Sequence, residues 1–403
     1  MGRSLKTRRQ ECRCYRGFPF WPGKTMLHLT QGPSELLFEG ENNLAAPTML
    51  SCATAVPPRR FTQEETFGLL GYTSPRVRQI FLNSDIDYRY FWADPEGFTP
   101  DETPDQFHAR YKEGAMHLGC LAAREALERA GLQPTDLDAI FVASCTGYLC
   151  PDLSTMLIGH LELRGDVQRG ALLGHGCAGA MPLLQRASDH ALAYPGHRVL
   201  AIATEICSAS YFIDNTLETI IGNAICADGA AAVIVGDGAE PAASAPGNST
   251  ARNLGPSNAG PKIVAFQSVI DPSQIDKVGF EQRAGKLRII LAAEIRDMAG
   301  PMIEKCLDGL LGAWGLKKQD IRFWVMHPGG RKVIDVAAKY LGLAEEQLRF
   351  SRHVLRNYGN MSSPTALFVL DEVVRSGEPQ PGDYGVLMAL GPGFAAEGAL
   401  LRW

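Results

Sequence analysis

Two segments in different halves of the chain follow one pattern, and this repetition is the strongest constraint on the fold. The first is "EALERAGLQPTDLDAIFVASCTG" (residues 125–147), and the second is "KCLDGLLGAWGLKKQDIRFWVMHPGG" (residues 305–330). Each reads as an amphipathic helix, a Gly-Leu stop, a short polar turn with an Asp, and a buried strand. The Gly-Leu stops are Gly131-Leu132 and Gly315-Leu316. The repetition predicts that the chain contains a duplicated α/β unit.

The apolar segments that follow each copy alternate with helical patterns. "ALLGHGC", "HRVLAIATE" and "AAAVIVGDG" read as strands in the first half, and "TALFVLDEVVRSG" reads as a helix before the strand "YGVLMAL" in the second. Strands with near-continuous apolar character are typical of sheets that are buried on both faces by helices. We therefore predict a layered α/β protein, and duplication of the unit gives a five-layer αβαβα fold with pseudo-twofold symmetry.

A change in composition divides the chain. Residues 238–261, "GAEPAASAPGNSTARNLGPSNAGP", are rich in Gly, Ala, Ser, Pro and Asn and lack apolar periodicity. This predicts a linker or long loop between an N-terminal domain, 47–237, and a C-terminal domain, 262–403. Residues 1–46 are predicted to be a flexible extension, or the product of an upstream start codon. Their basic start lacks the apolar stretch of a secretory signal.

Bulk composition excludes several classes of protein. Apolar residues make up 45% and charged residues 21% of the 403 residues, and the net charge is -5. This argues against a nucleic-acid-binding protein, which usually has a basic face. No apolar run reaches the roughly 18 residues of a membrane span. The ten cysteines are irregularly spaced without a C-x-x-C pair, and the nine histidines show no metal-binding spacing. We therefore expect a cytoplasmic protein with free thiols and no metal.

Cys177 is a candidate nucleophile because of its position between a predicted strand and a predicted helix. A thiol at a helix N-terminus meets aligned N–H groups, which favour the thiolate. Gly176 and Gly179 flank this region and allow a substrate carbonyl to approach the backbone. The alternative from the local sequence is a buried structural thiol, since free cysteine packs like a small apolar residue.

Two further polar residues occupy similar positions in the second half. His327 follows the apolar run Phe323–Met326 and precedes a Gly-rich turn, and Asn360 lies in a turn ahead of a helix. Each has an ordinary alternative, a solvent-facing loop histidine and a helix-capping asparagine. Together with Cys177 they form a set suited to acyl transfer. The thiolate attacks a thioester, the histidine accepts its proton or donates to an oxyanion, and the asparagine amide donates to the same oxyanion.

The sequence resembles the type III polyketide synthases, the chalcone synthase-like members of the thiolase superfamily. The matching segments are "GHGCAGAMPLL", "EICSASYF", "IGNAICADGAAAVIVG", "VMHPGGRKVID", "RNYGNMSSPTALFVL" and "LGPGFAAEGALL". They occur in the family's order over residues 47–403. The resemblance implies a thiolase-like fold, a homodimer and a catalytic triad of Cys177, His327 and Asn360. It also implies that acyl-CoA and malonyl-CoA are used directly, without a carrier protein or a cofactor.

The resemblance also assigns residues to the substrate cavity and to CoA binding. The cavity positions are Thr146, Cys150, Cys226, Ile289, Ser362, Gly391, Pro392 and Gly393, and the CoA-binding positions are Arg76 and Arg78. Thr146 and Ser362 have structural roles as alternatives, and a solvated helix face is the alternative for the two arginines. The plant enzymes have Phe at the gatekeeper positions that Cys226 and Ile289 occupy, and Met at the position of Cys150. Smaller side chains predict a wider channel, unless other side chains refill the space.

The favoured hypothesis is a synthase that loads a fatty acyl starter, extends it with malonyl-CoA and cyclises it to an alkylpyrone or alkylresorcinol. Three alternatives remain open at this point. They are a ketoacyl-ACP synthase III-like enzyme that makes one condensation, a chalcone- or stilbene-type synthase with an aromatic starter, and a non-catalytic scaffold. The context "GNMSSPT" and the terminal "GPG" favour the polyketide synthase over the first alternative.

Overall fold

The computed structural model describes residues 46–93, 102–237, 260–292 and 294–403. These residues lie within one compact unit, residues 44–403. Nine strands form one mixed sheet in the order β11-β12-β13-β8-β1-β7-β6-β4-β5. Their bounds are β1 (Thr48–Ala55), β4 (Ala139–Ala143), β5 (Gln168–Leu172), β6 (Val199–Ile206), β7 (Asp228–Gly236), β8 (Lys262–Ile270), β11 (Ile321–Met326), β12 (Tyr384–Gly391) and β13 (Ala395–Arg402).

The two halves of this sheet repeat one pairing pattern. In the first half β4 is parallel to β6, β6 is antiparallel to β7, and β7 is antiparallel to β1. In the second half β11 is parallel to β12, β12 is antiparallel to β13, and β13 is antiparallel to β8. The halves meet where Thr48 of β1 pairs with Lys262 of β8. The duplication predicted from the two Gly-Leu segments is therefore confirmed, with β5 as an additional strand at one edge.

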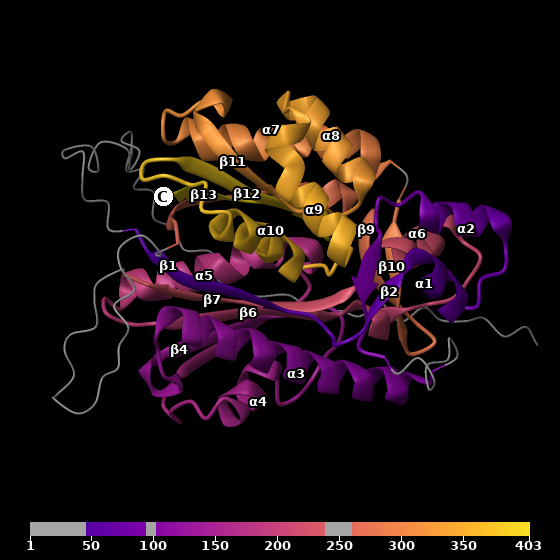
Figure 1. Ribbon diagram of the computed structural model, residues 1–403, viewed down its shortest axis with the longest axis horizontal. Helices are drawn as coiled ribbons and strands as arrows, with labels where there is room; N and C mark the ends of the chain where they lie inside the picture. The colour runs from indigo at the N-terminus through magenta and orange to yellow at the C-terminus, as the bar shows by residue number, and fades with distance from the viewer. Residues whose placement is uncertain (1–45, 94–101, 238–259, 293) are drawn as a thin grey trace, which may run out of the picture. The chain divides into compact units, whose positions relative to one another are not determined.

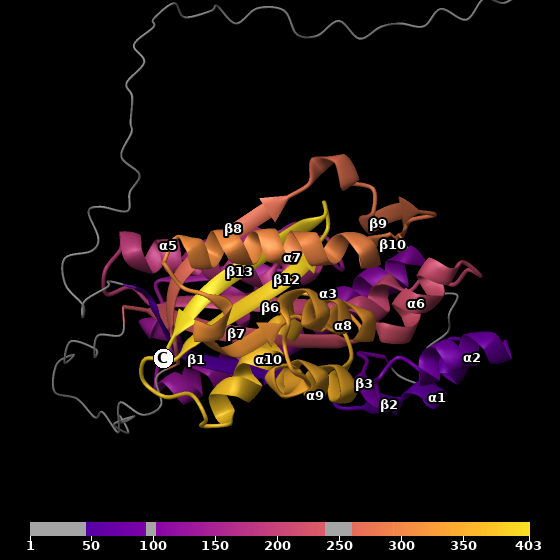
Figure 2. The ribbon, with the colours of Figure 1, turned by 90° about the horizontal axis from the view of Figure 1, so that it is seen from above.

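Three layers of helices alternate with the two half-sheets, which gives five layers in all (Figure 1). The central layer contains α5 (Ala180–Ala193) and α10 (Pro364–Arg375), which contact strands of both halves. The outer layers contain α3 (Pro104–Ala130) on β1, β6 and β7, and α7 (Ile295–Gly312) on β8 and β13. Figure 2 shows α7 running across the second half-sheet, with α8 (Arg331–Leu341) beside it. The thiolase-like αβαβα architecture is confirmed.

Local sequence explains why these elements form where they do. The strand β7 is buried along its whole length, as expected for an apolar run covered by helices on both faces. The helix α3 begins with a capping box of Thr103 and Gln106 and ends at Gly131, whose φ of 66° lies in the left-handed region that glycine tolerates. Pro364 starts α10 at a position that needs no backbone N–H.

Most of the remaining elements lie at one end of the layers (Figure 1). They are α1 (Gln63–Leu69), α2 (Pro75–Leu82), α4 (Leu153–His160), α6 (Leu217–Ile225), α9 (Arg349–Tyr358), β2 (Arg60–Thr62), β3 (Tyr88–Tyr90), β9 (Val278–Arg283) and β10 (Lys286–Leu291). Among them α6 contacts α1, α2 and β10, while α4 lies apart from this group, against α3 and β4. The C-terminus of α6 adjoins the candidate site, because Cys226, which follows the helix, forms a bridge with Asn360.

The predicted domain boundaries remain predictions. The proposed extension, residues 1–46, and the proposed linker, residues 238–261, lie outside the described residues except for Ala46, Gly260 and Pro261. No helix in the described part of the chain is long and apolar enough to cross a membrane.

Candidate active site

Cys177 lies in a short 3-10 turn, Gly176–Ala178, between β5 and α5. The predicted strand-to-helix position is confirmed, and α5 itself begins three residues later, at Ala180. The thiol is partly exposed. Loss of solvation raises the pKa of Cys177 to about 11, which outweighs the opposite effect of hydrogen bonds from Ser362 and Asn360. In this state the thiol is protonated at neutral pH, so the site needs a base to form the nucleophile.

The glycines near Cys177 allow two protein segments to pack closely against each other. A Cβ on Gly176 would lie 2.5 Å from Cδ of Pro392, and a Cβ on Gly391 would lie 2.6 Å from Cβ of Ala178. Gly176 also has a φ of 50°. These glycines therefore let the Cys177 turn pack directly against the loop at the end of β12. Close packing of two protein segments is thus one structural reason for glycine at position 176, and the approach of a substrate carbonyl stays a prediction.

Asn360 is held next to Cys177 with a defined orientation of its amide group. Its Oδ1 accepts a hydrogen bond from the backbone N–H of Ser362 at 2.8 Å, and its Nδ2 donates to the carbonyl of Gly329 at 3.2 Å. A backbone N–H only donates and a carbonyl only accepts, so these partners fix which end of the amide is nitrogen. The same Nδ2 lies 3.8 Å from Sγ of Cys177. Oδ1 lies 3.9 Å from the same sulfur, so both ends of the Asn360 amide group adjoin the thiol.

His327 follows β11 directly and is 4% exposed. Its backbone N–H donates to the carbonyl of Met388 in β12 at 2.8 Å, which fixes the residue at the strand end. Neither ring nitrogen has a hydrogen-bond partner among the described residues. Burial lowers the pKa of His327 to about 3, so the imidazole is neutral at physiological pH. A neutral imidazole with an uncommitted nitrogen is able to accept a proton.

The structure reveals a buried carboxylate that the sequence analysis missed. Glu205, at the end of β6, is completely buried. Its Oε2 accepts hydrogen bonds from the backbone N–H groups of Cys145 and Thr146 and from the Thr146 hydroxyl, and its Oε1 accepts from Ser363. Burial raises the pKa of Glu205 in spite of these donors. An acidic residue inside the apolar run "HRVLAIATE" was the available signal.

Two predicted cavity residues, Thr146 and Ser362, lie at the polar network around Glu205. Thr146 is buried with its hydroxyl on Glu205 at 2.8 Å. Ser362 has a φ of 61°, which is unusual for a residue with a side chain, and its Oγ lies 3.5 Å from Sγ of Cys145. Backbone strain of this kind concentrates at functional sites. The thiol of Cys145 therefore adjoins Ser362, two residues after Asn360, a contact that the sequence did not reveal.

Cys226 and Ile289 line one small pocket, together with Ser210, Tyr211, Phe212, Thr219, Gly222, Asn223 and Phe280. The space inside it is about 10 Å³, roughly enough for one water molecule. At these two positions the pocket is small, and Tyr211, Phe212 and Phe280 also line it. This favours the alternative that other side chains refill the space over the expected wider channel.

Three predicted residues lie away from this centre. Cys150 is exposed in the single chain. Arg76 and Arg78 lie on α2, which contacts α1 and α6. Arg78 pairs with Glu64 at 2.8 Å, which raises the pKa of Arg78. The side chain of Arg78 is thus engaged by a carboxylate, and the CoA-binding role of both arginines remains a prediction. No cluster of three or more metal-binding side chains occurs among the described residues.

Comparison with known proteins agrees with this geometry. Residues 101–241 match the family of chalcone and stilbene synthases, N-terminal domain, and residues 264–403 match its C-terminal domain. A 3,5-dihydroxyphenylacetyl-CoA synthase of Amycolatopsis balhimycina is 34% identical, with 87% of this chain and 91% of the relative covered. A 1,3,6,8-tetrahydroxynaphthalene synthase of Streptomyces peucetius subsp. caesius is 30% identical, with 87% and 91% covered.

Solved structures are similar over nearly the same length. A polyketide synthase of the brown alga Ectocarpus siliculosus superposes with a TM-score of 0.78 at 30% identity, covering 89% of this chain and 98% of its own. The 1,3,6,8-tetrahydroxynaphthalene synthase of Streptomyces coelicolor A3(2), a bacterial type III polyketide synthase, gives 0.79 at 26% identity, with 88% and 99% covered. The chain belongs to the chalcone and stilbene synthase family, and is a type III polyketide synthase, a condensing acyltransferase that uses malonyl-CoA.

Proposed function

We propose that Cys177, His327 and Asn360 perform the condensation in this chain. The observation that carries the proposal is the fixed Asn360 amide, whose nitrogen faces the Cys177 sulfur at 3.8 Å. His327 accepts the thiol proton, and the Cys177 thiolate attacks the starter thioester carbonyl. The C–S bond to CoA then breaks, and the CoA thiolate takes up the proton. The starter acyl group is left on Cys177 as a thioester.

Chain extension uses the same donors. Asn360 Nδ2 and His327 hold the thioester carbonyl oxygen of malonyl-CoA, so that loss of CO₂ leaves an enolate whose negative charge they stabilise. The enolate carbon attacks the Cys177 thioester and the C–S bond to Cys177 breaks, which lengthens the chain by two carbons. The CoA thioesters act directly, without a carrier protein or additional cofactor, and the working enzyme is a homodimer.

For the starter, we infer a short acyl group, with products assembled chiefly from malonyl units. Tyr211, Phe212 and Phe280 share the small pocket lined by Cys226 and Ile289, which leaves little room for an acyl chain. The 3,5-dihydroxyphenylacetyl-CoA and 1,3,6,8-tetrahydroxynaphthalene synthases among the relatives are named for small aromatic products, in agreement with this choice. The second candidate is a fatty acyl starter that yields an alkylpyrone or alkylresorcinol. The small side chains at Cys150 and Cys226 favour it.

A starter panel distinguishes these candidates. The purified enzyme is incubated with malonyl-CoA alone, and with malonyl-CoA plus acyl-CoAs from C2 to C18, and products are identified by mass spectrometry. We expect cyclised products from malonyl-CoA alone or with short starters. Long-chain pyrones or resorcinols as the dominant products would instead establish the second candidate.

The same assay tests the single-condensation alternative. No carrier protein is added, because a ketoacyl-ACP synthase III-like enzyme needs its malonyl unit on a carrier. Products with two or more extensions from CoA thioesters support the polyketide synthase. A single diketide, or no product until carrier protein is added, would overturn the proposal. Light scattering coupled to size-exclusion chromatography measures the mass of the enzyme in solution. A homodimer has twice the mass of one chain.

A further inference from the structure

Arg89 in β3 is a buried cation whose hydrogen bonds go to backbone carbonyls. The side chain is 0% exposed and its guanidinium carbon lies 5.5 and 5.2 Å from the ring centres of Phe81 and Phe91. Its Nη1 donates to the carbonyls of Asn223 at 2.7 Å and Cys226 at 2.8 Å. Burying a charge is costly, so a residue of this kind is expected to serve a definite structural purpose.

The carbonyls that Arg89 binds belong to the C-terminus of α6. The last four carbonyls of a helix have no donor within the helix, and a cation near that end is favourable. Arg89 supplies donors to Asn223 and to the capping residue Cys226, and Gln63 Nε2 donates to Ala224 at 2.8 Å. The Tyr211 hydroxyl also donates to the Cys226 carbonyl, at 3.3 Å. The Arg89 guanidinium, which bridges the Asn223 and Cys226 carbonyls, thus helps to fix the place and direction in which the chain leaves α6.

The segment that leaves α6, residues 225–227, holds the backbone of Asn360. The N–H of Asn360 donates to the carbonyl of Ile225, and the N–H of Ala227 donates to the carbonyl of Asn360, both at 2.8 Å. Cys226 and Asn360 form a parallel bridge between these hydrogen bonds. The guanidinium of Arg89 and the amide of Asn360 are therefore connected through one short segment. The same segment carries Cys226 at the pocket.

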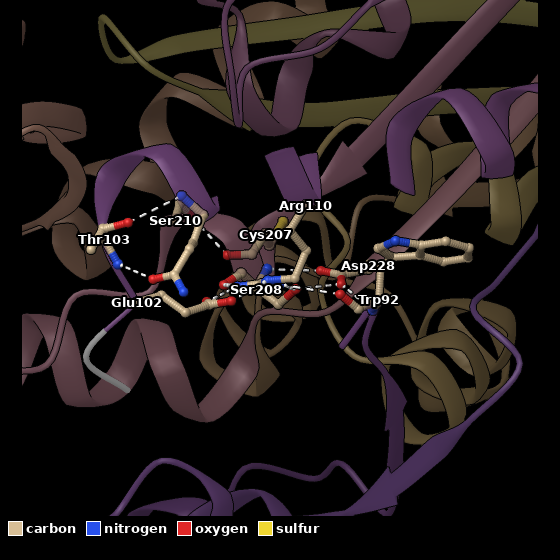
Figure 3. Close-up of polar contacts among 9 residues, drawn as sticks. Trp92, Glu102, Thr103, Arg110, Cys207, Ser208, Ser210 and Asp228 are labelled. Carbon is tan, nitrogen blue, oxygen red and sulfur yellow. Dashed lines mark hydrogen bonds and ion pairs between the residues drawn. The ribbon is translucent and has the colours of Figure 1, made fainter. Parts of the chain in front are cut away.

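A separate network anchors the residue after this segment. Asp228 is fully buried, and its carboxylate accepts hydrogen bonds from the backbone N–H of Ser208 at 2.8 Å and of Trp92 at 2.7 Å. Arg110 reaches the Ser208 hydroxyl from α3 (Figure 3). The end of the segment at Asp228 is thus fixed without Arg89. Loss of Arg89 is expected to free only the end at α6, which is the end that adjoins Asn360.

We propose that Arg89 is a positioning residue that sets the location of the Asn360 amide for malonyl decarboxylation. This inference rests on the proposed function, in which Asn360 binds the malonyl thioester oxygen. Cys177 lies on a different segment, between β5 and α5, so the hydrogen bonds that Arg89 makes at the end of α6 do not hold its backbone. Arg89 consequently affects the extension step far more than the loading step.

The test compares the variants Arg89→Lys and Arg89→Met with Arg129→Lys. Arg129 is the control, because it also donates to a backbone carbonyl, that of Cys52 at 2.6 Å, and its other printed partners, Glu125 and Asp371, lie outside residues 225–227. Lysine keeps the charge, but its ammonium is carried on a flexible stem instead of the rigid, planar guanidinium whose Nη1 serves both carbonyls. Malonyl-CoA decarboxylation, alkylation of Cys177 by iodoacetamide and thermal unfolding are measured for each variant. If Arg89→Met does not fold, the comparison is made between Arg89→Lys and Arg129→Lys alone.

We expect kcat for decarboxylation to fall about 10- to 100-fold in the folded Arg89 variants, because displacement of a catalytic group by about 1 Å costs this much. Cys177 alkylation should stay within about twofold of wild type, and Arg129→Lys should keep its kcat. In the double variant with Asn360→Ala, Arg89→Lys should add little further loss, because both changes act through one amide. Equal losses in Arg89→Lys and the control, or full additivity in the double variant, would overturn the inference.

The same measurements test the function of Asn360 and the positioning role of Arg89 separately. If Asn360→Ala retains decarboxylation, the proposed function of Asn360 is wrong. If Asn360→Ala loses decarboxylation while Arg89→Lys keeps it, only the positioning role of Arg89 is wrong.

Discussion

The amide nitrogen of Asn360 lies 3.8 Å from the sulfur of Cys177, although the two residues are 183 positions apart. Cys177 comes from the first half of the duplicated fold and Asn360 from the second, and both lie where the central helices α5 and α10 begin. The site therefore depends on correct packing of one half against the other. At neutral pH the Cys177 thiol and the His327 imidazole are both uncharged, because burial raises the pKa of the first and lowers the pKa of the second.

Replacement of Asn360 by Ala should separate the two steps of the reaction. Removing one donor at such an oxyanion site typically lowers the rate about 10²- to 10³-fold. We therefore expect malonyl-CoA decarboxylation to fall by about this factor, while acyl transfer from a starter CoA to Cys177 continues. Release of CO₂ reports the first step, and intact-protein mass spectrometry reports the second. If decarboxylation and acyl transfer were lost equally, the substitution would be acting on the folded structure and not on one step of the reaction.

The pH dependence of Cys177 alkylation should reveal His327 as the base. Burial raises the pKa of Cys177 to about 11, and under the proposed function the neutral imidazole of His327 is the proton acceptor that makes thiolate available at lower pH. The variant His327→Gln should need a higher pH for the same rate of alkylation by iodoacetamide. Cys177→Ala identifies labelling at other thiols and is the control. Identical pH profiles for wild type and His327→Gln would exclude His327 as the base.

His327 should also make the fold sensitive to acid. Its pKa is about 3 in the folded protein and near 6.5 in an unfolded chain, so the unfolded state binds the proton more readily. The stability associated with the neutral imidazole is complete above pH 6.5 and decreases as pH falls toward 3. Thermal unfolding between pH 7 and 4 should show a larger loss of Tm for wild type than for His327→Gln. Parallel curves would contradict the burial of a neutral histidine.

Enlarging the pocket beside Cys226 should change starter choice. Phe280 lines this pocket with Cys226 and Ile289, and its truncation to Ala opens space that the aromatic ring fills. The ratio of kcat/KM for a C12 acyl-CoA to that for a C2 acyl-CoA should rise about tenfold or more, since each buried methylene is worth about 0.8 kcal/mol. Competition between the two starters measures this ratio. An unchanged ratio would show that acyl chains occupy another part of the enzyme.

Glu205 should contribute to stability through its acceptor capacity. The change Glu205→Gln puts an amide N–H₂ where the carboxylate accepts hydrogen bonds from Cys145, Thr146 and Ser363. Unsatisfied buried donors cost about 1–3 kcal/mol, so the free energy of unfolding in urea should fall by about this amount. Glu125→Gln, at an exposed ion pair with Arg129, is the control and should change it by under about 1 kcal/mol. Equal losses of unfolding free energy in Glu205→Gln and Glu125→Gln would contradict this role of the Glu205 carboxylate.

The sequence by itself determined the layers and the main catalytic candidates. Continuous apolar runs predicted strands such as β6, β7 and β12, and the repeated Gly-Leu stops predicted the duplication, because periodicity and turn chemistry are local properties. Cys177, His327 and Asn360 were recognisable since each follows or precedes a regular element, where polar side chains reach a shared edge. A buried carboxylate such as Glu205 leaves only a faint trace in the sequence, one charge in an apolar run.

Tertiary structure alone decided how these residues work together. The orientation of the Asn360 amide depends on the N–H of Ser362 and the carbonyl of Gly329, and its backbone depends on the segment that Arg89 fixes from β3. The small side chains at Cys226 and Ile289 predicted a wide pocket, but rings from Tyr211, Phe212 and Phe280 share that space. The physical reason is that cavity volume and hydrogen-bond direction are set by packing between distant segments, which no local pattern encodes.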